Sequence, residues 1–284
     1  MPLCKELLLS ICFFSLAICT SAFADEVSLS PQQLIAFQGK AFSLHISSSI
    51  EVSSAAASFL DKAVPYYPQG LQFRAVLGIP AETKPGIYPL IVKVESPLGT
   101  RLIKQSLTIK KTYFPAEYGR IGNATFSLLK WVAEDQAKLT NILTREAGAQ
   151  YWSGKFNVPT LGKYTSPFGA HRVFNGAMIG FHRGQDIAGP VGSQIRAANA
   201  GVVAMAEKLK VHGNTIVLDH GQGIYTLYNH LSKMVVKAGD RVWKGEIIGR
   251  MGSTGFSTGS HLHWGVSIHD ERVDPISFSK LDIN

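Results

Sequence analysis

The sequence predicts a mainly β protein in which two β domains are joined by a helical connector. Over residues 25–112, short stretches alternate apolar and polar side chains and recur at the regular spacing of a β-sandwich-like domain. Residues 113–150 contain a long stretch with three-to-four apolar spacing, which is the period of a helix. Over residues 151–284, short β runs are separated by frequent glycines, so we expect a C-terminal antiparallel β domain.

Residues 1–24 have the order of a secretory signal peptide. A positive residue near the amino terminus is followed by an apolar run to Cys19 and by the small-x-small triplet Ala22-Phe23-Ala24. An uncleaved anchor helix needs about 20 apolar residues, more than this run offers. A lipoprotein modified at Cys19 is a third reading, but the large Ile18 precedes the cysteine. We therefore expect cleavage after residue 24 and an exported protein, periplasmic or associated with the cell envelope.

All three cysteines lie inside this segment, so the mature protein has none. An exported protein without cysteine has no disulfide framework, and a metal site in it must use imidazole and carboxylate. The segment holds one Lys and one Glu, so the mature chain keeps the net charge of +8. The positive charges are scattered, which argues against a nucleic-acid partner. They serve solubility or a weak attraction to an anionic cell wall.

Four stretches of the first β domain are predicted as strands: residues 41–46, 71–77, 87–94 and 101–109. Lys84-Pro85-Gly86 is predicted as a turn between them. The domain contains no catalytic cluster. His45 stands alone there, and an isolated strand histidine is more often structural than functional.

The connector helix is predicted from six apolar residues on one face: Leu128, Leu129, Val132, Leu139, Ile142 and Leu143. Asn123 or Thr125 could cap its start and Gly148 could end it. We interpret the apolar face as a packing surface. Four strands are predicted in the C-terminal domain, over residues 195–206, 214–218, 223–231 and 261–268.

Seven of the nine histidines lie between His171 and His263, so the C-terminal domain is the place for chemistry. Three stretches stand out, namely His182-Arg183-Gly184-Gln185-Asp186, residues 225–231 and residues 259–265. Since strand residues two apart share a face, we expect His261 and His263 in one cleft. The same rule predicts one shared face for Thr226, Tyr228 and His230. His182 and Asp186 are expected on a loop that enters a strand.

Three or four imidazoles and one carboxylate are a donor set that suits zinc. A catalytic zinc takes three protein ligands and keeps a fourth position for water. Peptide hydrolysis also needs a group that accepts the water proton and donors that stabilise the oxyanion, and spare histidines could provide both. Each stretch alone is weak evidence. Their conjunction in a β domain of an exported chain indicates a metallohydrolase.

These stretches resemble the lysostaphin/LytM-type metallopeptidases, the M23 family. The resemblance covers about residues 151–278. It also includes Thr165-Ser166-Pro167-Phe168-Gly169, residues 213–221, Tyr228-Asn229-His230-Leu231-Ser232 and Gly252-Ser253-Thr254-Gly255. Residues 78–88 more faintly resemble a β domain that precedes some members of the family.

The resemblance implies a lysostaphin-like, hybrid-motif peptidase fold with a Zn²⁺ cofactor. It implies that the metal ligands are His182, Asp186 and His263, and that His230 and His261 are catalytic. The implied function is a zinc-dependent endopeptidase that cuts peptide cross-links of bacterial peptidoglycan. In a directly cross-linked wall the expected bond is D-Ala to diaminopimelate, with polyglycine bridges or elastin-like targets as alternatives. Two departures from the family pattern, which remove no ligand, are Gln185 and Asn229.

The remaining histidines are not expected in the site. His220 lies in a turn, where it is expected to shape the hairpin, and His171, His212 and His269 match no ligand position. A structural role is predicted for two other polar residues, Arg172 and Asn214.

Two other functions stay open at this point. A non-catalytic wall-binding or amidase-activating module on the same fold would be expected to lack ligands, all of which are present here. Residues 236–249 resemble a hairpin of biotinyl/lipoyl carriers and sugar phosphocarriers. The export signal and the five-residue site disfavour a carrier function. We expect a monomer whose partner is peptidoglycan, without a transmembrane helix after signal cleavage. The N-terminal domain is expected to limit substrate access or to bind the wall.

Overall fold

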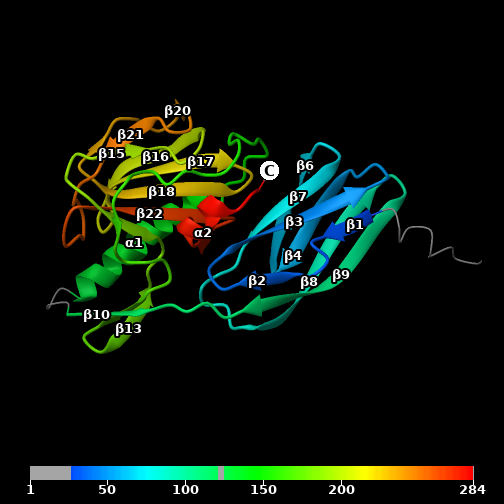
Figure 1. The fold of residues 1–284 in the computed structure, drawn as a ribbon, viewed down its shortest axis with the longest axis horizontal. Helices are drawn as coiled ribbons and strands as arrows, with labels where there is room; N and C mark the ends of the chain where they lie inside the picture. The colour runs from blue at the N-terminus through cyan, green and yellow to red at the C-terminus, as the bar shows by residue number, and fades with distance from the viewer. Residues whose placement is uncertain (1–26, 121–124, 284) are drawn as a thin grey trace, which may run out of the picture.

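The computed structural model describes residues 27–120 and 125–283. The predicted signal peptide, its Cys19 alternative and the helix cap proposed at Asn123 lie outside the described residues. Figure 1 shows a β-sandwich beside one end of a second β domain, with the long helix packed on the second domain. Among the described helices, none is long and apolar enough to cross a membrane.

Two sheets face each other in the N-terminal sandwich. The first has the order β1 (Val27–Ser30), β3 (Ala41–Ser48), β7 (Gln72–Gly78), β6 (Tyr67–Gln69). The second has the order β2 (Ile35–Phe37), β9 (Gly99–Lys110), β8 (Gly86–Ser96), β4 (Ser54–Phe59), β5 (Lys62–Pro65). Alternate residues of both sheets point inward, and Leu44, Ile46, Leu90, Val92 and Leu107 are fully buried between them.

The C-terminal domain is built on an eight-stranded antiparallel sheet. Its path is β11 (Lys163–Tyr164), β14 (Gln185–Ala188), β22 (His261–Ile268), β18 (Ile224–Leu231), β17 (Gly213–Gly221), β16 (Gly201–Leu209), β20 (Arg241–Val242), and β23 (Glu271–Val273) pairs with β22. A small sheet has the order β15 (Gln194–Arg196), β21 (Ile247–Arg250), β19 (Lys233–Met234), and α2 (Pro275–Lys280) follows β23. The single strand predicted over residues 195–206 is thus two strands, β15 and β16.

The two faces of the large sheet are covered differently. One face carries Tyr228, Trp264 and Val266 into the main core. On the other face, helix α1 (Thr125–Leu143) packs through Leu139, Ile142 and Leu143 against Met205, Val217, Tyr225 and Leu227. Leu227 pairs with Gly265, so His263, two residues along β22, lies on the helix-covered face.

The helix differs from its prediction in two respects. It ends at Leu143, before Gly148. Leu129 and Val132, predicted on the packed face, are 46% and 41% exposed. The other four predicted residues are buried, and Leu139, Ile142 and Leu143 in the last turns pack against β16, β17 and β18.

The connector also contains a strand that its sequence did not predict. β10 (Ala116–Gly119) pairs in parallel with β12 (His171–Phe174), which pairs with β13 (Ala177–Phe181). Residues just after the sandwich therefore complete a sheet of the C-terminal domain. This is a parallel pairing in a domain that was predicted to be antiparallel.

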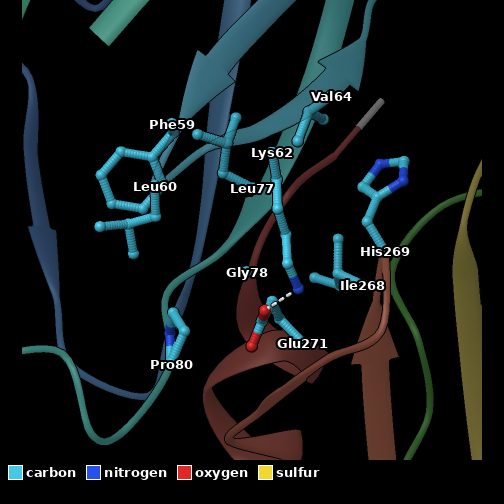
Figure 2. Close-up of a pocket in the computed structure, with 10 residues that line it drawn as sticks. All are labelled: Phe59, Leu60, Lys62, Val64, Leu77, Gly78, Pro80, Ile268, His269 and Glu271. Carbon is cyan, nitrogen blue, oxygen red and sulfur yellow. Dashed lines mark hydrogen bonds and ion pairs between the residues drawn. The ribbon is translucent and has the colours of Figure 1, made fainter. Parts of the chain in front are cut away.

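The sandwich is fixed on the C-terminal domain by buried polar contacts. Arg74 is 1% exposed and donates to Gln222 Oε1 (2.6 Å), to Gln150 Oε1 (3.2 Å) and to the Ile283 carbonyl, while its guanidinium lies over Trp152. Figure 2 shows the ion pair of Lys62 with Glu271 beside Gly78. A Cβ at Gly78 would lie 2.8 Å from the Glu271 Cβ, so the two domains meet here at backbone distance.

Candidate active site with a metal-binding group

Strand register brings the candidate side chains together. β14 and β22 are antiparallel, with Asp186 opposite His263 and Ala188 opposite His261. His182 precedes β14 in a loop held by two backbone bonds, His182 N to Ala170 O and Gly169 N to His182 O, each 2.8 Å. The predicted loop that enters a strand is therefore present, and it delivers His182 beside Asp186.

Three donor atoms converge on one point. His182 Nε2 lies 2.8 Å from His263 Nδ1 and 3.1 Å from Asp186 Oδ1, and the last two atoms are 2.9 Å apart. All three side chains are largely shielded, with 6%, 12% and 13% of their surface exposed for His182, Asp186 and His263. The group could hold a metal ion. Two imidazole nitrogens and one carboxylate oxygen match the three-ligand set of catalytic zinc sites.

The hydrogen bond on the other side of His182 fixes which nitrogen faces the group. His182 Nδ1 lies 2.9 Å from the Pro167 carbonyl oxygen. A carbonyl oxygen can only accept, so Nδ1 carries the hydrogen and Nε2 presents its lone pair to the group. This arrangement is the one that a metal-ligating imidazole requires.

Gly184 is required by the same packing. A Cβ at this position would lie 2.5 Å from the Trp264 carbonyl oxygen and 2.6 Å from His263 Nε2. The contact with a backbone atom cannot be relieved by a side-chain rotation. A larger residue would therefore displace the His263 ring.

His230 and His261 lie side by side next to this group. Their ring centroids are 4.8 Å apart, and the His230 centroid is 6.2 Å from that of His263. His230 Nδ1 donates to Thr254 O and His261 Nδ1 to Gly259 O, both at 2.8 Å. In each ring Nδ1 is therefore held by a carbonyl and Nε2 remains for chemistry, and His261 Nε2 lies 3.8 Å from Asp186 Oδ2.

The prediction that Thr226, Tyr228 and His230 share a face holds for Thr226 and Tyr228, whose hydroxyl oxygens are 2.9 Å apart, and is wrong for His230. Tyr228 is buried in the main core, and its hydroxyl donates to no site residue but accepts from the Ala198 amide (2.9 Å). His230 has φ of +62°, in the left-handed region. This conformation breaks the strand alternation and turns the His230 ring to the opposite face, where His261 and His263 lie.

Burial sets the proton occupancy of these groups. Burial lowers the pKa of His263 to about 3 and that of His230 to about 4, against partial compensation by Asp186 and by the Thr254 carbonyl respectively. Burial would raise the pKa of Asp186, but the adjoining His182 and His263 imidazoles hold it well below its usual range. At neutral pH the His263 and His230 rings are neutral and Asp186 is ionised. His263 and Asp186 therefore have the charge states that binding of a cation needs.

The structure adds residues that the sequence did not point to. Arg172, expected to be structural, places Nη2 3.0 Å from Ser166 Oγ and 3.8 Å from Asp186 Oδ2. Glu117, on the connector strand, pairs with Arg172 at 2.8 Å. Ser166 lies in a stretch that resembles the family, so the sequence could have indicated it as a site residue. No sequence pattern marked Glu117.

The discounted histidines have partners elsewhere. His212 contacts Asp135 and His269 contacts Glu146, at 2.9 and 2.7 Å. His220 is fully buried between the Ala200 carbonyl and the Thr226 hydroxyl, both 2.7 Å away.

Comparison with known proteins gives the family. The model of peptidase family M23 matches residues 180–275. A crystal structure from Pseudomonas aeruginosa, named as a peptidase M23, is 30% identical with a TM-score of 0.65, over 86% of this chain and 94% of that one. The chain belongs to peptidase family M23, and the predicted fold class is confirmed.

Curated relatives share the C-terminal part. The DD-carboxypeptidase/endopeptidase Mpg of Neisseria meningitidis is 38% identical over 128 residues, 44% of this chain and 29% of its own length. The peptidoglycan DD-endopeptidase ShyA of Vibrio cholerae is 39% identical over 102 residues, 36% of this chain and 23% of its own. The match spans less than a third of either relative.

Proposed function

We propose that this protein is a zinc-dependent endopeptidase that hydrolyses peptide cross-links of bacterial peptidoglycan. The observation that carries the proposal is the convergence of His182 Nε2, Asp186 Oδ1 and His263 Nδ1 beside two further imidazoles with free Nε2 atoms. The relatives named as DD-endopeptidases support a bond between D-Ala and diaminopimelate as the target.

His182, Asp186 and His263 would hold the zinc ion. Bound there, it supplies Lewis acidity toward a peptide carbonyl and toward water. The residues present fit this ion, because Pro167 O fixes the His182 tautomer and Asp186 is ionised at neutral pH. Asp186 leaves its second oxygen, Oδ2, facing His261 and Arg172.

His230 and His261 would carry out the proton transfers. Peptide hydrolysis needs one group that takes a proton from water and another that stabilises the oxyanion and protonates the leaving amine. The Thr254 and Gly259 carbonyls hold both Nδ1–H groups, so Nε2 of each ring is available to accept a proton and then to donate it. The low pKa of His230, about 4, keeps its ring neutral at neutral pH, with the Nε2 lone pair unprotonated.

This activity places the protein outside the cytoplasmic membrane, where peptidoglycan lies. Residues 1–24 would serve as the export signal, and the protein would act in the periplasm or cell envelope as a monomer. The excess of positive charge, +8, would attract it to an anionic wall.

The test is digestion of defined muropeptides by zinc-loaded protein of residues 25–284, with mass analysis of the products. We expect a D-Ala–diaminopimelate cross-linked dimer to give two monomers, and no reaction after His263→Ala substitution. Cleavage of a polyglycine bridge, with no cleavage of this dimer, would show that the target is a glycine–glycine bond and not D-Ala–diaminopimelate. Stoichiometric zinc with no cleavage of any cross-linked peptide would instead establish a non-catalytic wall-binding module.

A further inference from the structure

The segment that follows the sandwich packs against the residues that support the candidate metal group. Phe114 packs edge-on against Phe168 and Phe181, with ring centroids 6.3 and 6.4 Å apart. Gly169 has φ of +80°, and a Cβ there would lie 2.2 Å from the Phe114 ring. The connector therefore presses on the turn whose Pro167 carbonyl accepts from His182 Nδ1.

Three residues further on, the connector makes an ionic contact toward the same group. In the parallel β10–β12 pairing Glu117 is opposite Arg172, and their side chains form an ion pair of 2.8 Å with 29% of each side chain exposed. The other end of the guanidinium donates to Ser166 Oγ (3.0 Å), and Ser166 Oγ lies 3.0 Å from His182 Nδ1. Arg172 thus joins the connector to the first candidate ligand through one serine.

Arg172 also lies next to the second candidate ligand. Its Nη2 is 3.8 Å from Asp186 Oδ2, beyond hydrogen-bond distance. A guanidinium free to move would form a bidentate pair with this carboxylate, since that geometry is favoured. Such a pair would compete with a metal ion for the Asp186 oxygens. Glu117 and Ser166, which hold the two ends of the guanidinium, prevent this movement.

We propose that Glu117 and Arg172 are positioning residues of the metal centre, by which the interdomain connector sets the orientation of His182 and the availability of Asp186. The inference rests on the proposed metal site and concerns how that site is held. Partners of metal ligands of this kind typically change metal affinity by about 10- to 100-fold when they are substituted.

The experiment measures zinc dissociation constants by competition with a chromogenic chelator, in protein of residues 25–284. We expect Glu117→Gln and Arg172→Gln each to weaken zinc binding by about 10- to 100-fold. The double variant should be no weaker than the weaker single variant, because Glu117 acts through Arg172. The visible absorption of the cobalt-substituted protein should change in Glu117→Gln, since the ligand geometry relaxes.

Glu82→Gln is the matched control. It removes a glutamate whose partner, Arg183, is next to His182 in sequence, at a longer distance of 3.7 Å and with both side chains about half exposed. Zinc affinity and the cobalt spectrum should be unchanged in this variant. Thermal unfolding of the metal-free proteins checks that Glu117→Gln and Arg172→Gln remain folded.

Unchanged zinc affinity in folded Glu117→Gln, or losses that simply add in the double variant, would overturn the positioning role. His182→Ala separates this result from a failure of the proposed function. If the wild-type protein binds no zinc, or His182→Ala binds it as tightly as wild type, the metal site itself is wrong and both inferences fail.

Discussion

His230 occupies its place in the site through its backbone as much as through its ring. Its φ of +62° lies in a region that non-glycine residues seldom adopt, and its amide donates to the His212 carbonyl at 2.9 Å. Backbone strain of this kind persists where the surroundings fix it, and it is concentrated at functional sites. This backbone conformation points the His230 ring toward His261 and His263, whereas in a regular strand it would point to the opposite face.

The roles proposed for the five candidate residues separate in a substitution series. We expect His230→Ala and His261→Ala to retain stoichiometric zinc while the rate falls by about 10²–10⁴, because only proton transfer is removed. His182→Ala and His263→Ala should lose both zinc and activity, because two ligands remain. Elemental analysis and peptide hydrolysis measure the two properties separately. Loss of metal from His261→Ala would mean that the two histidines of β22 share or exchange roles.

The sequence predicted these five residues but not the whole site. The family resemblance implied His182, Asp186 and His263, and the register of β14 with β22 does bring Asp186 and His263 together. His182 joins them from the loop before β14. Alternation failed for His230, whose left-handed backbone is not encoded in a period of two. Glu117 escaped notice because it is brought to Arg172 by a pairing between segments more than fifty residues apart along the chain.

At the scale of elements, helix α1 holds the loop that supports His230. The Asp135 carboxylate accepts from the backbone amides of Lys210, Val211 and His212 at 3.0, 2.8 and 3.1 Å. It also accepts from His212 Nδ1 at 2.9 Å. Burial would raise the pKa of Asp135, but these hydrogen bonds lower it to about 2. The helix therefore anchors residues 210–212, and the His212 carbonyl accepts from the His230 amide.

Asp135→Asn should lower both the stability of the protein and its catalytic rate. The amide has one acceptor oxygen and would turn its NH₂ toward a backbone N–H, so we expect a loss of about 1.5–3 kcal/mol in the free energy of unfolding. Displacement of the loop should also lower the catalytic rate through His230. Glu134→Gln is the control, since this neighbour forms an exposed pair with Lys210, and its loss should cost less than about 1 kcal/mol. Denaturant unfolding and peptide hydrolysis report the two effects.

A second element-scale prediction concerns His220 on β17. Burial lowers its pKa from 6.5 to about 4. The unfolded chain therefore binds the proton first, so this contribution to stability is complete above pH 6.5 and is lost as the pH falls toward 4. The loss amounts to about 3 kcal/mol at 1.36 kcal/mol per pKa unit. Metal-free wild-type protein should lose more unfolding free energy across this window than His220→Gln does. Equal pH slopes would show that His220 does not titrate in this way.

Element prediction succeeded where the period was clear and failed where tertiary contacts decide. Strands such as 41–48 and 261–268 follow their alternation. The strand at 116–119 has only four residues and exists because β12 pairs with it. Leu129 and Val132 fit the helical period but are exposed, because periodicity does not show where the sheet beneath a helix ends.

At the scale of the whole molecule, the sandwich and the catalytic sheet form a fixed pair. The buried Arg74 joins β7 to Gln150, Gln222 and the Ile283 carbonyl, and Gly39 O accepts from the Asp274 amide at 2.7 Å. One pocket between the domains, lined by Leu60, Pro80 and Ile268, has a volume of ≈ 20 Å³, about the room for one water (Figure 2). The buried contacts of Arg74 favour a fixed spacer over a domain that opens and closes.

The contacts of the site side chains bear on the proposed role of the sandwich as a lid. The partners described for the five candidate side chains come from residues 166–263, within the C-terminal domain. The Lys62–Glu271 pair lies near the end of β22 at Ile268, and Arg74 contacts Gln222, two residues before Ile224, which pairs with Ile268. Ile268 is five residues from His263 and hence about 16 Å away along the strand. Glu82 of the sandwich does reach Arg183, next to His182, but at 3.7 Å and with both side chains about half exposed. We therefore expect the sandwich to position the enzyme on the wall and not to block its cleft.

Arg74→Gln in the full chain tests this expectation. The shorter Gln side chain cannot reach the three partners of Arg74 together. The interface between the sandwich and the C-terminal domain should therefore weaken, and the melting temperature should fall. A positioning domain predicts an unchanged rate on a soluble cross-linked dimer and slower digestion of intact sacculi, because only the large substrate needs both domains held in one orientation. A lid predicts the opposite on the small substrate, since a loosened sandwich would uncover the cleft. A protein of residues 113–284, which keeps the connector strand and Glu117 but lacks the sandwich, provides the limiting case. A faster rate on the soluble dimer in either protein would establish the lid and reject the positioning role.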